Sequence, residues 1–221
     1  MKFRHEYKHC INLMDIYCLR TRLSAVMKHD RNAGEDGTYL VKSLYFDNYM
    51  DQALREKVDG VNKREKFRIR YYGTDTSFIR LEKKSKINGL CNKVSVRITK
   101  EECQSIIDGN IEFMKEDERN LLRELYSKMK YQLLRPKCIV SYTRESFVYP
   151  PGNVRVTLDT NIGGSNSIRS FLNPETKFLC LYRNSILEVK WDEFLPEIVR
   201  YAVGLHSRRS GAFSKYAAVR F

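Results

Sequence analysis

Two neighbouring stretches of the chain alternate strictly between charged and apolar residues. In KFRIRYYG, residues 66–73, cations occupy positions 66, 68 and 70, and aromatic or aliphatic residues lie between them. In SFIRLEKKSK, residues 77–86, charged residues again occupy every second position from Arg80 onward. A period of two is that of a β-strand, in which successive side chains point to opposite faces. The pattern therefore predicts a sheet with one apolar face and one cationic face.

The same alternation recurs along the chain, interrupted by segments of helical periodicity. Strands are predicted at 2–10, 38–46, 66–73, 77–86, 91–99, 137–149, 154–162 and within 177–191. Helices are predicted at 12–29, after a cap at Asp47, twice within 99–130, and at 192–205. Asn12 and the pair Thr99 and Glu102 are suited to cap helices, and Asn88-Gly89 predicts a tight hairpin. We expect an α+β fold in one domain spanning residues 1–221, because no repeat or shift in composition divides the chain.

Most of the net charge lies on the polar faces of the predicted strands. The chain has a formal net charge of +13, and these faces carry thirteen bases and four acids. Such a surplus indicates an anionic partner, such as nucleic acid, acidic lipid or a phosphate-rich small molecule. The residues concerned are Arg4, Glu6, Lys8, Lys66, Arg68, Arg70, Arg80, Glu82, Lys84, Lys86, Lys93, Arg97, Arg144, Arg155, Asp159, Glu188 and Lys190.

Two geometries could use these charges. An open sheet would expose a flat basic face, whereas a closed barrel would turn the charge inward around a polar lumen and leave the apolar faces to external helices. Eight strands are enough to close, and closure removes exposed edges. The four acids within the basic rows could be ion-pair partners, or they could hold Mg²⁺ or Mn²⁺ that bridges phosphate oxygens. We expect the closed eight-stranded barrel, with helices packed outside.

Other classes of site are disfavoured. Six cysteines without CxxC spacing and four scattered histidines argue against a zinc site. RNA-binding sheets place aromatic residues on the binding face, whereas Phe67 and Tyr71 lie opposite the cations, so nucleic acid is not expected as a partner. No apolar stretch reaches 18 residues and the N-terminus lacks a signal-like apolar core, so we expect a cytoplasmic protein.

Nine short motifs occur in the order found in a known family. They are RHEYKH, SLYFDN, KFRIRYYG, LEKKSK, NKVSV, YTRESF, VRVTLDT, LEVKW and FSKY. In these motifs the chain resembles the VTC domain, the catalytic domain of the vacuolar transporter chaperone complex and its bacterial relatives. That family belongs to the triphosphate tunnel (CYTH-like) metalloenzymes, whose fold is an eight-stranded antiparallel barrel. The resemblance covers almost the whole chain.

The resemblance implies a polyphosphate polymerase, which adds the γ-phosphoryl group of ATP to a growing phosphate chain with Mn²⁺ or Mg²⁺ as cofactor. Carried over by motif, the catalytic phosphate path would consist of Lys8, Arg68, Arg70, Lys84, Lys93, Arg144, Arg155 and Lys215. Further substrate contacts would come from Arg4, Lys66, Arg80, Lys86, Tyr142, Lys190 and Ser214. The metal ligands would be Glu188, with Glu6 or Glu82.

The chain departs from the family pattern at its start. Hydrolase relatives begin Glu-x-Glu-x-Lys, whereas Arg4 replaces the first glutamate here. Losing a carboxylate and gaining a cation should weaken water activation and favour binding of phosphate chains. The alternatives are a triphosphate hydrolase or nucleotide cyclase of the same fold, and a non-catalytic protein that binds polyphosphate or nucleic acid. This sequence shows no membrane segment, so we expect any transport of product to need a separate membrane protein, which would hold the enzyme at the inner face of the membrane.

Overall fold

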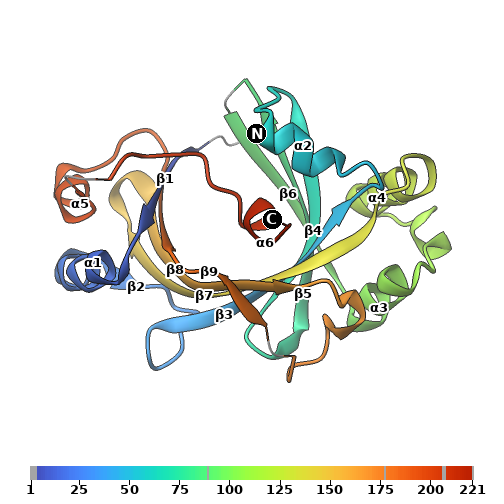
Figure 1. The fold of residues 1–221 in the computed structure, drawn as a ribbon, viewed down its shortest axis with the longest axis horizontal. Coiled ribbons are helices and arrows are strands. Elements are labelled where there is room, and N and C mark those ends of the chain that lie inside the picture. Colours follow the sequence, from blue (N-terminus) through green and yellow to red (C-terminus); the bar gives the residue numbers. More distant parts are fainter. Residues whose placement is uncertain (1–3, 89, 177, 206–207, 221) are drawn as a thin grey trace.

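A computed structural model describes residues 4–88, 90–176, 178–205 and 208–220. Its central feature is one antiparallel sheet that curls strongly around a hollow side (Figure 1). Eight strands follow one another across the sheet, and two short strands join beside this path: β2 (Lys28–His29) on β7 and β9 (Leu179–Tyr182) on β8. In spatial order the path is β1 (His5–Ile11), β10 (Ser185–Trp191), β8 (Val154–Ser165), β7 (Arg135–Tyr149), β3 (Thr38–Asp47), β4 (Arg64–Tyr72), β5 (Asp75–Ile87) and β6 (Leu90–Ile98).

The sheet is an open half-barrel, and the expectation of a closed barrel is corrected here. Among the described residues, the terminal strands β1 and β6 pair only with their inner neighbours β10 and β5. Both edges carry cations on the hollow side, Lys8 on β1 and Lys93 and Arg97 on β6. Joining the two edges would bring these like charges side by side, which is unfavourable. Charged side chains also protect a free edge from pairing with other chains.

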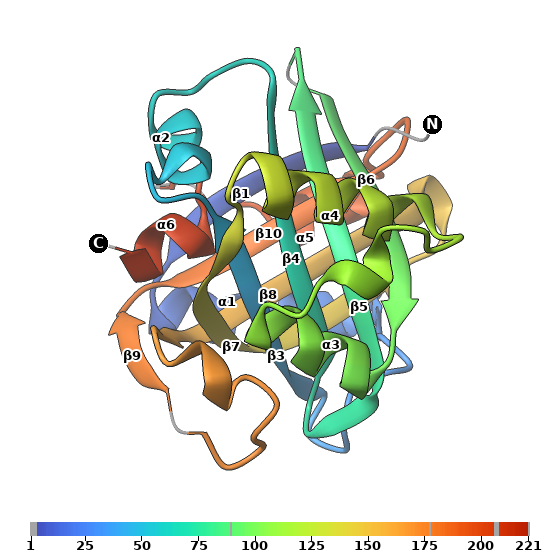
Figure 2. The same ribbon diagram turned by 90° about the vertical axis from the view of Figure 1, so that its right-hand side faces the viewer.

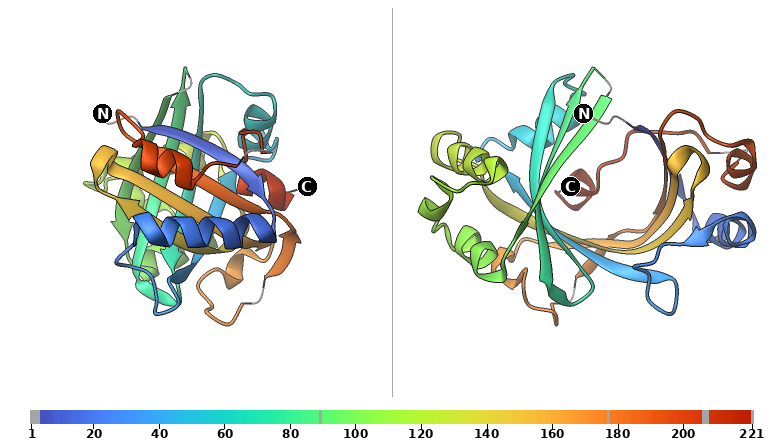
Figure 3. Two further views of the ribbon diagram at one scale, coloured as in Figure 1. Left: turned by 90° about the vertical axis from the view of Figure 1, so that its left-hand side faces the viewer. Right: turned by 180° about the vertical axis from the view of Figure 1, so that it is seen from behind.

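The convex face of the sheet is apolar and is covered by helices, as the alternation predicts. On one side α1 (Leu13–Val26) and α5 (Glu197–Ala202) pack on β1, β10 and β8 (Figure 3). On the other side α3 (Lys100–Asp108) and α4 (Asn120–Tyr131) pack on β4 to β6 (Figure 2). Leu19 and Leu125 illustrate the two layers, because both side chains are fully buried. Burying such side chains stabilises the fold by about 1.5–3 kcal/mol each. None of the described helices is both long and apolar enough to cross a membrane.

A short helix near the end of the chain lies inside the curl. Helix α6 (Lys215–Arg220) is enclosed by the sheet in Figures 1 and 3. Its Tyr216 is buried, stacks on Tyr45 of β3 with ring centroids 5.2 Å apart, and donates a hydrogen bond of 2.6 Å to Asp47. One end of the hollow side is therefore filled by aromatic packing. The sequence predicts only that this tail is basic with an apolar stripe.

Local signals mark some element boundaries better than others. Asn12 caps α1 and Thr99 caps α3, each in a reciprocal capping box, as predicted. Helix α2 (Gln52–Val58) starts later than predicted, with Asp51 at its cap, although the Asp47 carboxylate still accepts a hydrogen bond of 2.8 Å from the Ala53 amide. The single strand predicted within 177–191 divides into β9 and β10. Gly89 of the predicted hairpin turn lies outside the described residues, but β5 and β6 do pair as that hairpin requires.

Candidate functional site

The hollow side of β4, β5 and β6 carries a dense set of cations. The antiparallel register places Lys66 opposite Lys84, Lys84 opposite Lys93, and Arg70 opposite Arg80. Like charges in directly opposed positions destabilise a sheet unless an anion lies between them. Eight cations and one acid share this region, which we call the cationic half: Lys66, Arg68, Arg70, Arg80, Glu82, Lys84, Lys86, Lys93 and Arg97.

Glu82 is the single carboxylate of the cationic half, and it is already engaged. Its side chain is 1% exposed, lies 2.6 Å from Arg68 Nη2, and is bonded to Lys93 Nζ at 3.3 Å. Burial alone would raise the pKa of Glu82, but Arg68, Arg70 and Lys93 outweigh it and hold that pKa well below its usual range. Glu82 is therefore ionised at neutral pH and orients Arg68.

Lys84 lies where the two sides of the curl approach each other. It forms no ion pair among the residues that the structure describes. Burial, followed by the charges of Lys190 and Arg68, holds the pKa of Lys84 well below its usual range, while Glu188 and Glu6 oppose that shift. Lys190, Glu188 and Glu6 belong to β10 and β1, at the opposite end of the strand order. The charges of β5 therefore interact with those of β1 and β10 across the hollow side, although these strands do not pair.

The hollow side of β1 and β10 carries cations and acids in equal number. Lys8 lies 2.7 Å from Glu6 and 3.8 Å from Glu188, and Lys190 pairs with both carboxylates. Burial would raise the pKa of Glu188, yet Lys190 and Lys8 hold it well below its usual range. Burial would lower the pKa of Lys8, but Glu188 and Glu6 raise it. These shifts favour the charged forms of Lys8 and Glu188, and the cluster holds two acids and two bases.

A second ion-paired cluster surrounds Asp159 of β8. Arg144 of β7 binds its carboxylate through two hydrogen bonds of 2.6 and 2.8 Å, and Lys215 of α6 lies 2.6 Å away. Burial would raise the pKa of this fully buried acid, but Arg144 and Lys215 lower it. With the β1 and β10 residues this cluster forms what we call the balanced half, in which four cations face three acids: Glu6, Lys8, Arg144, Asp159, Glu188, Lys190 and Lys215.

Tyr142 connects the two halves. Its hydroxyl accepts a hydrogen bond of 2.9 Å from Arg70 Nη2. The Lys215 ammonium lies 4.7 Å and the Arg144 guanidinium carbon 5.2 Å from the centroid of its ring, and both distances are within the range of cation–π attraction. Arg70 of β4 and the cations of β7 and α6 are thus brought around one aromatic side chain.

Some residues proposed from the resemblance lie apart from the cations that surround Tyr142. Arg155 is 47% exposed and pairs with Asp30 at 3.0 Å. Arg4 pairs with Asp192 at 2.8 Å, beyond the ends of β1 and β10. Arg80 belongs to the cationic half but lies toward its margin, where its guanidinium carbon is 4.7 Å from the centroid of the Phe78 ring. Ser214 is buried just before α6, where its hydroxyl accepts a 3.4 Å hydrogen bond from the Ala217 amide.

Sequence reasoning missed two cations that border a cavity of about 670 Å³ beside α6. Lys57 of α2 and Arg64 of β4 line it together with Lys86, and among its described lining residues there is no acid. Tyr182 and Phe213, whose ring centroids are 4.9 Å apart, form part of its wall. No motif signals Lys57, because its place depends on how α2 docks. This cavity extends the cationic half toward α2.

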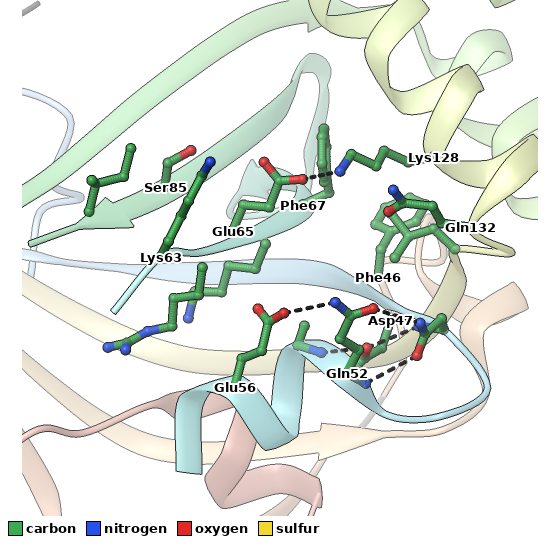
Figure 4. Close-up of a pocket in the computed structure, with 16 residues that line it drawn as sticks. Phe46, Asp47, Gln52, Glu56, Lys63, Glu65, Phe67, Ser85, Lys128 and Gln132 are labelled. Atoms are coloured by element: carbon green, nitrogen blue, oxygen red, sulfur yellow. Dashed lines mark hydrogen bonds and ion pairs between the residues drawn. The ribbon is translucent and has the colours of Figure 1, made fainter. Parts of the chain in front are cut away.

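A second cavity, of about 450 Å³, lies beside α2 and α4 and has a different character (Figure 4). Two of its acids are engaged within it: Lys128 lies 2.5 Å from Glu65, and Gln52 donates a hydrogen bond of 2.8 Å to Glu56. Lys63, Arg64 and Lys66 also line this cavity, but its described wall mixes these bases and Lys128 with three acids. We therefore do not assign an anion site here.

The acids of the balanced half fit a divalent cation bound together with phosphate. No group of three or more histidine, cysteine or acidic side chains suited to a metal occurs in the described ranges. Mg²⁺ and similar ions usually take one or two carboxylates and fill their remaining positions with water and substrate phosphates. Glu6 and Glu188 meet that need, since both are ionised and lie around Lys8.

Two solved structures share this fold. One is described as a putative adenylate cyclase from Bacillus halodurans, with a TM-score of 0.54 and 14% identity over 86% of this chain and 80% of that chain. The other is the PH1012 protein from Pyrococcus horikoshii, with a TM-score of 0.53 and 13% identity over 98% and 99%. At such identities the likeness concerns the fold alone. The search of curated proteins found no match. The model of the VTC domain family matches residues 3–220, nearly the whole chain. The chain therefore belongs to the VTC domain family, as its motifs indicate.

Proposed function

We propose that this protein is a polyphosphate polymerase that transfers the γ-phosphoryl group of ATP to a growing phosphate chain. The main support for this proposal is the charge imbalance of the cationic half, where eight cations share one carboxylate that is already paired. A polyanion with closely spaced charges compensates such a surface better than a single small anion does. Arginine supplies forked contacts to phosphate oxygens and lysine supplies compact charge.

The geometry suits phosphoryl transfer. This reaction needs alignment and charge neutralisation more than covalent help from side chains. Arg68 is fixed by Glu82, Arg70 by Ser43 and Tyr142, and Lys8 by Glu6, so these donors need little reorganisation during the reaction. The acceptor is a terminal phosphate, which is already anionic at neutral pH, so no general base is required. The family motif supports the same assignment for Lys84, Lys93, Arg144 and Lys215.

Glu188, assisted by Glu6, would hold the divalent cation, Mn²⁺ or Mg²⁺. Such an ion neutralises charge on phosphate oxygens and on the leaving group when it is bound. Lys8 and Lys190 compensate the two carboxylates when phosphate is absent. Because Glu82 is bonded to Arg68 and Lys93, we assign it to orienting Arg68 and not to the metal.

A triphosphate hydrolase or nucleotide cyclase of the same fold is the second candidate. The observation that favours it is that a structural neighbour is described as a putative adenylate cyclase. Arg4 argues for the polymerase, because it places a cation, paired with Asp192, where hydrolases carry a glutamate. A hydrolase would be expected to use that carboxylate in activating water.

One incubation tests the proposal. Purified protein with ATP and Mn²⁺ should produce ADP and a polymer visible on a gel, and exopolyphosphatase treatment should remove that polymer. Release of free phosphate without polymer would support the hydrolase, and formation of cyclic AMP would support the cyclase. Absence of turnover together with tight binding of tripolyphosphate would indicate a binding protein.

A further inference from the structure

Tyr45 lies at the centre of the cationic half although no motif assigns it a role. It is 4% exposed, and its hydroxyl accepts a hydrogen bond of 3.0 Å from Arg68 Nη1. The Lys66 ammonium lies 5.6 Å from its ring centroid, and Tyr216 of α6 stacks on it. Tyr45 is therefore held between the cations of β4 and the helix inside the curl.

If the Tyr45 phenol is neutral, the cations around it outnumber the acids. Within the described chain Lys66 has no carboxylate partner, and Arg70 donates to the neutral hydroxyls of Ser43 and Tyr142 at 3.0 and 2.9 Å. Glu82 alone must serve Arg68 and also Lys93. The groups that face or adjoin Tyr45 are Lys66, Arg68 and Arg70 of β4, Glu82 of β5 behind Arg68, Cys138 and Tyr142 of β7, and Tyr216 of α6. Beyond the Tyr216 ring, its hydroxyl donates to Asp47 of β3 and accepts from Arg220, so this acid is already engaged there.

The balance of interactions favours an ionised Tyr45. Burial would raise the pKa of Tyr45, but Arg68, Lys66 and Arg70 together lower it to about 7. The pKa of Lys66 is lowered to about 8 by burial, although Tyr45 opposes the shift. An unpaired buried cation is costly, so a nearby group that can release its proton relieves that cost.

We propose that Tyr45 is a proton-coupled counter-ion of the phosphate site. With the site empty its phenolate neutralises the β4 cations, and when a phosphate chain binds it takes up one proton from solvent and becomes a neutral phenol. No other bond forms or breaks. The inference rests on the proposed function for its ligand class, but it concerns binding and needs no turnover.

The coupling has a direct physical consequence. Phosphate oxygens replace the phenolate as counter-ions, and two anions side by side would repel each other, so binding raises the proton affinity of Tyr45. Binding linked to proton uptake weakens as pH rises above the pKa of the free site, by up to tenfold per pH unit for one proton. Tripolyphosphate affinity should therefore fall between about pH 7 and pH 9.

Ultraviolet difference spectroscopy can observe this proton, because a tyrosinate absorbs near 295 nm and a neutral phenol does not. Wild-type protein, Tyr45→Phe and the control Tyr131→Phe would be titrated between pH 6 and 9 with and without inorganic tripolyphosphate. Tyr131 is 79% exposed and is a matched control for losing one phenol. At pH 8.5 we expect about one tyrosinate per chain in the wild type and in Tyr131→Phe, and its signal should disappear when tripolyphosphate is added. In Tyr45→Phe we expect no tyrosinate at this pH.

A second measurement on wild type guards against misfolding of the variant. Calorimetry of tripolyphosphate binding at pH 8, in two buffers of different ionisation enthalpy, should report net uptake of protons. Three results would each overturn the inference. They are the absence of a tyrosinate below pH 9, a tyrosinate that persists when tripolyphosphate is bound, and failure of tripolyphosphate to bind. If the coupling is observed but ATP yields no polymer, the proposed function fails and the role of Tyr45 stands.

Discussion

The two halves of the hollow side differ in how their charges are compensated. The balanced half sets Lys8, Arg144, Lys190 and Lys215 against three acids, and these acids lie within ion-pair distance of the cations. The cationic half sets eight cations against Glu82. The first can be stable without a ligand, whereas the second stores repulsion that an anion would relieve. Under the proposed function, we expect phosphate to bind first at β4 to β6 and to meet the acids, and any metal, across the curl.

The largest expected effect comes from removing the paired arginines of the cationic half. Arg68→Ala combined with Arg70→Ala should lower polymer formation by at least about 10³-fold, because each removed donor typically costs 10²-fold or more. Polymer yield from ATP on gels is the measurement, and circular dichroism should show that the fold remains. Undiminished activity would refute the assignment of the cationic half as the phosphate site.

Glu188→Gln tests the acids of the balanced half. It should lower turnover by about 10²-fold and raise the Mn²⁺ concentration needed for half-maximal activity, because one carboxylate ligand is lost. The comparison is Glu82→Gln, in which metal dependence should not change because Glu82 is bonded to Arg68 and Lys93. An equal shift in both variants would remove the distinction between the two acids.

The paired carboxylates also predict a pH dependence of folding stability. The folded-state pKa values of Glu82, Glu188 and Asp159 are lowered, so the unfolded chain binds protons first as pH falls below the usual carboxyl range near 4. The stabilisation is therefore complete above that range and is lost progressively on acidification. Urea unfolding between pH 3 and 7 measures it. Glu82→Gln should show a shallower slope, and an unchanged slope would mean that its ion pairs contribute little.

The smallest effect is expected on the convex face. Lys83 lies on β5 between two residues of the cationic half, but its side chain points outward and pairs with Glu124 of α4 at 2.5 Å. Lys83→Ser should leave turnover unchanged and lower stability by no more than about 1 kcal/mol, because this ion pair remains partly solvated. Steady-state kinetics and urea unfolding check both values. A large loss of turnover would show that total charge matters more than the face that carries it.

The strands and their two faces could be predicted from the sequence, because a period of two places alternate residues on opposite sides wherever the strand lies. Phe67 and Ile69 are buried under the outer helices, and Lys66, Arg68 and Arg70 face inward, as the alternation requires. Motif order was enough to identify the family. Partners across the curl were not predictable, because the contact of Lys215 with Asp159 joins segments 56 residues apart.

Residue type and spacing alone determined the strand faces and the helix caps, since these depend on local geometry, and the charge pattern predicts an anionic ligand. Tertiary structure decided that the sheet stays open at β1 and β6, that α6 enters the curl, and that Glu82 is bonded to Arg68. It also placed Tyr45 among uncompensated cations. These outcomes depend on the curvature of the whole sheet and on burial, which set the distances between charges that are remote in sequence.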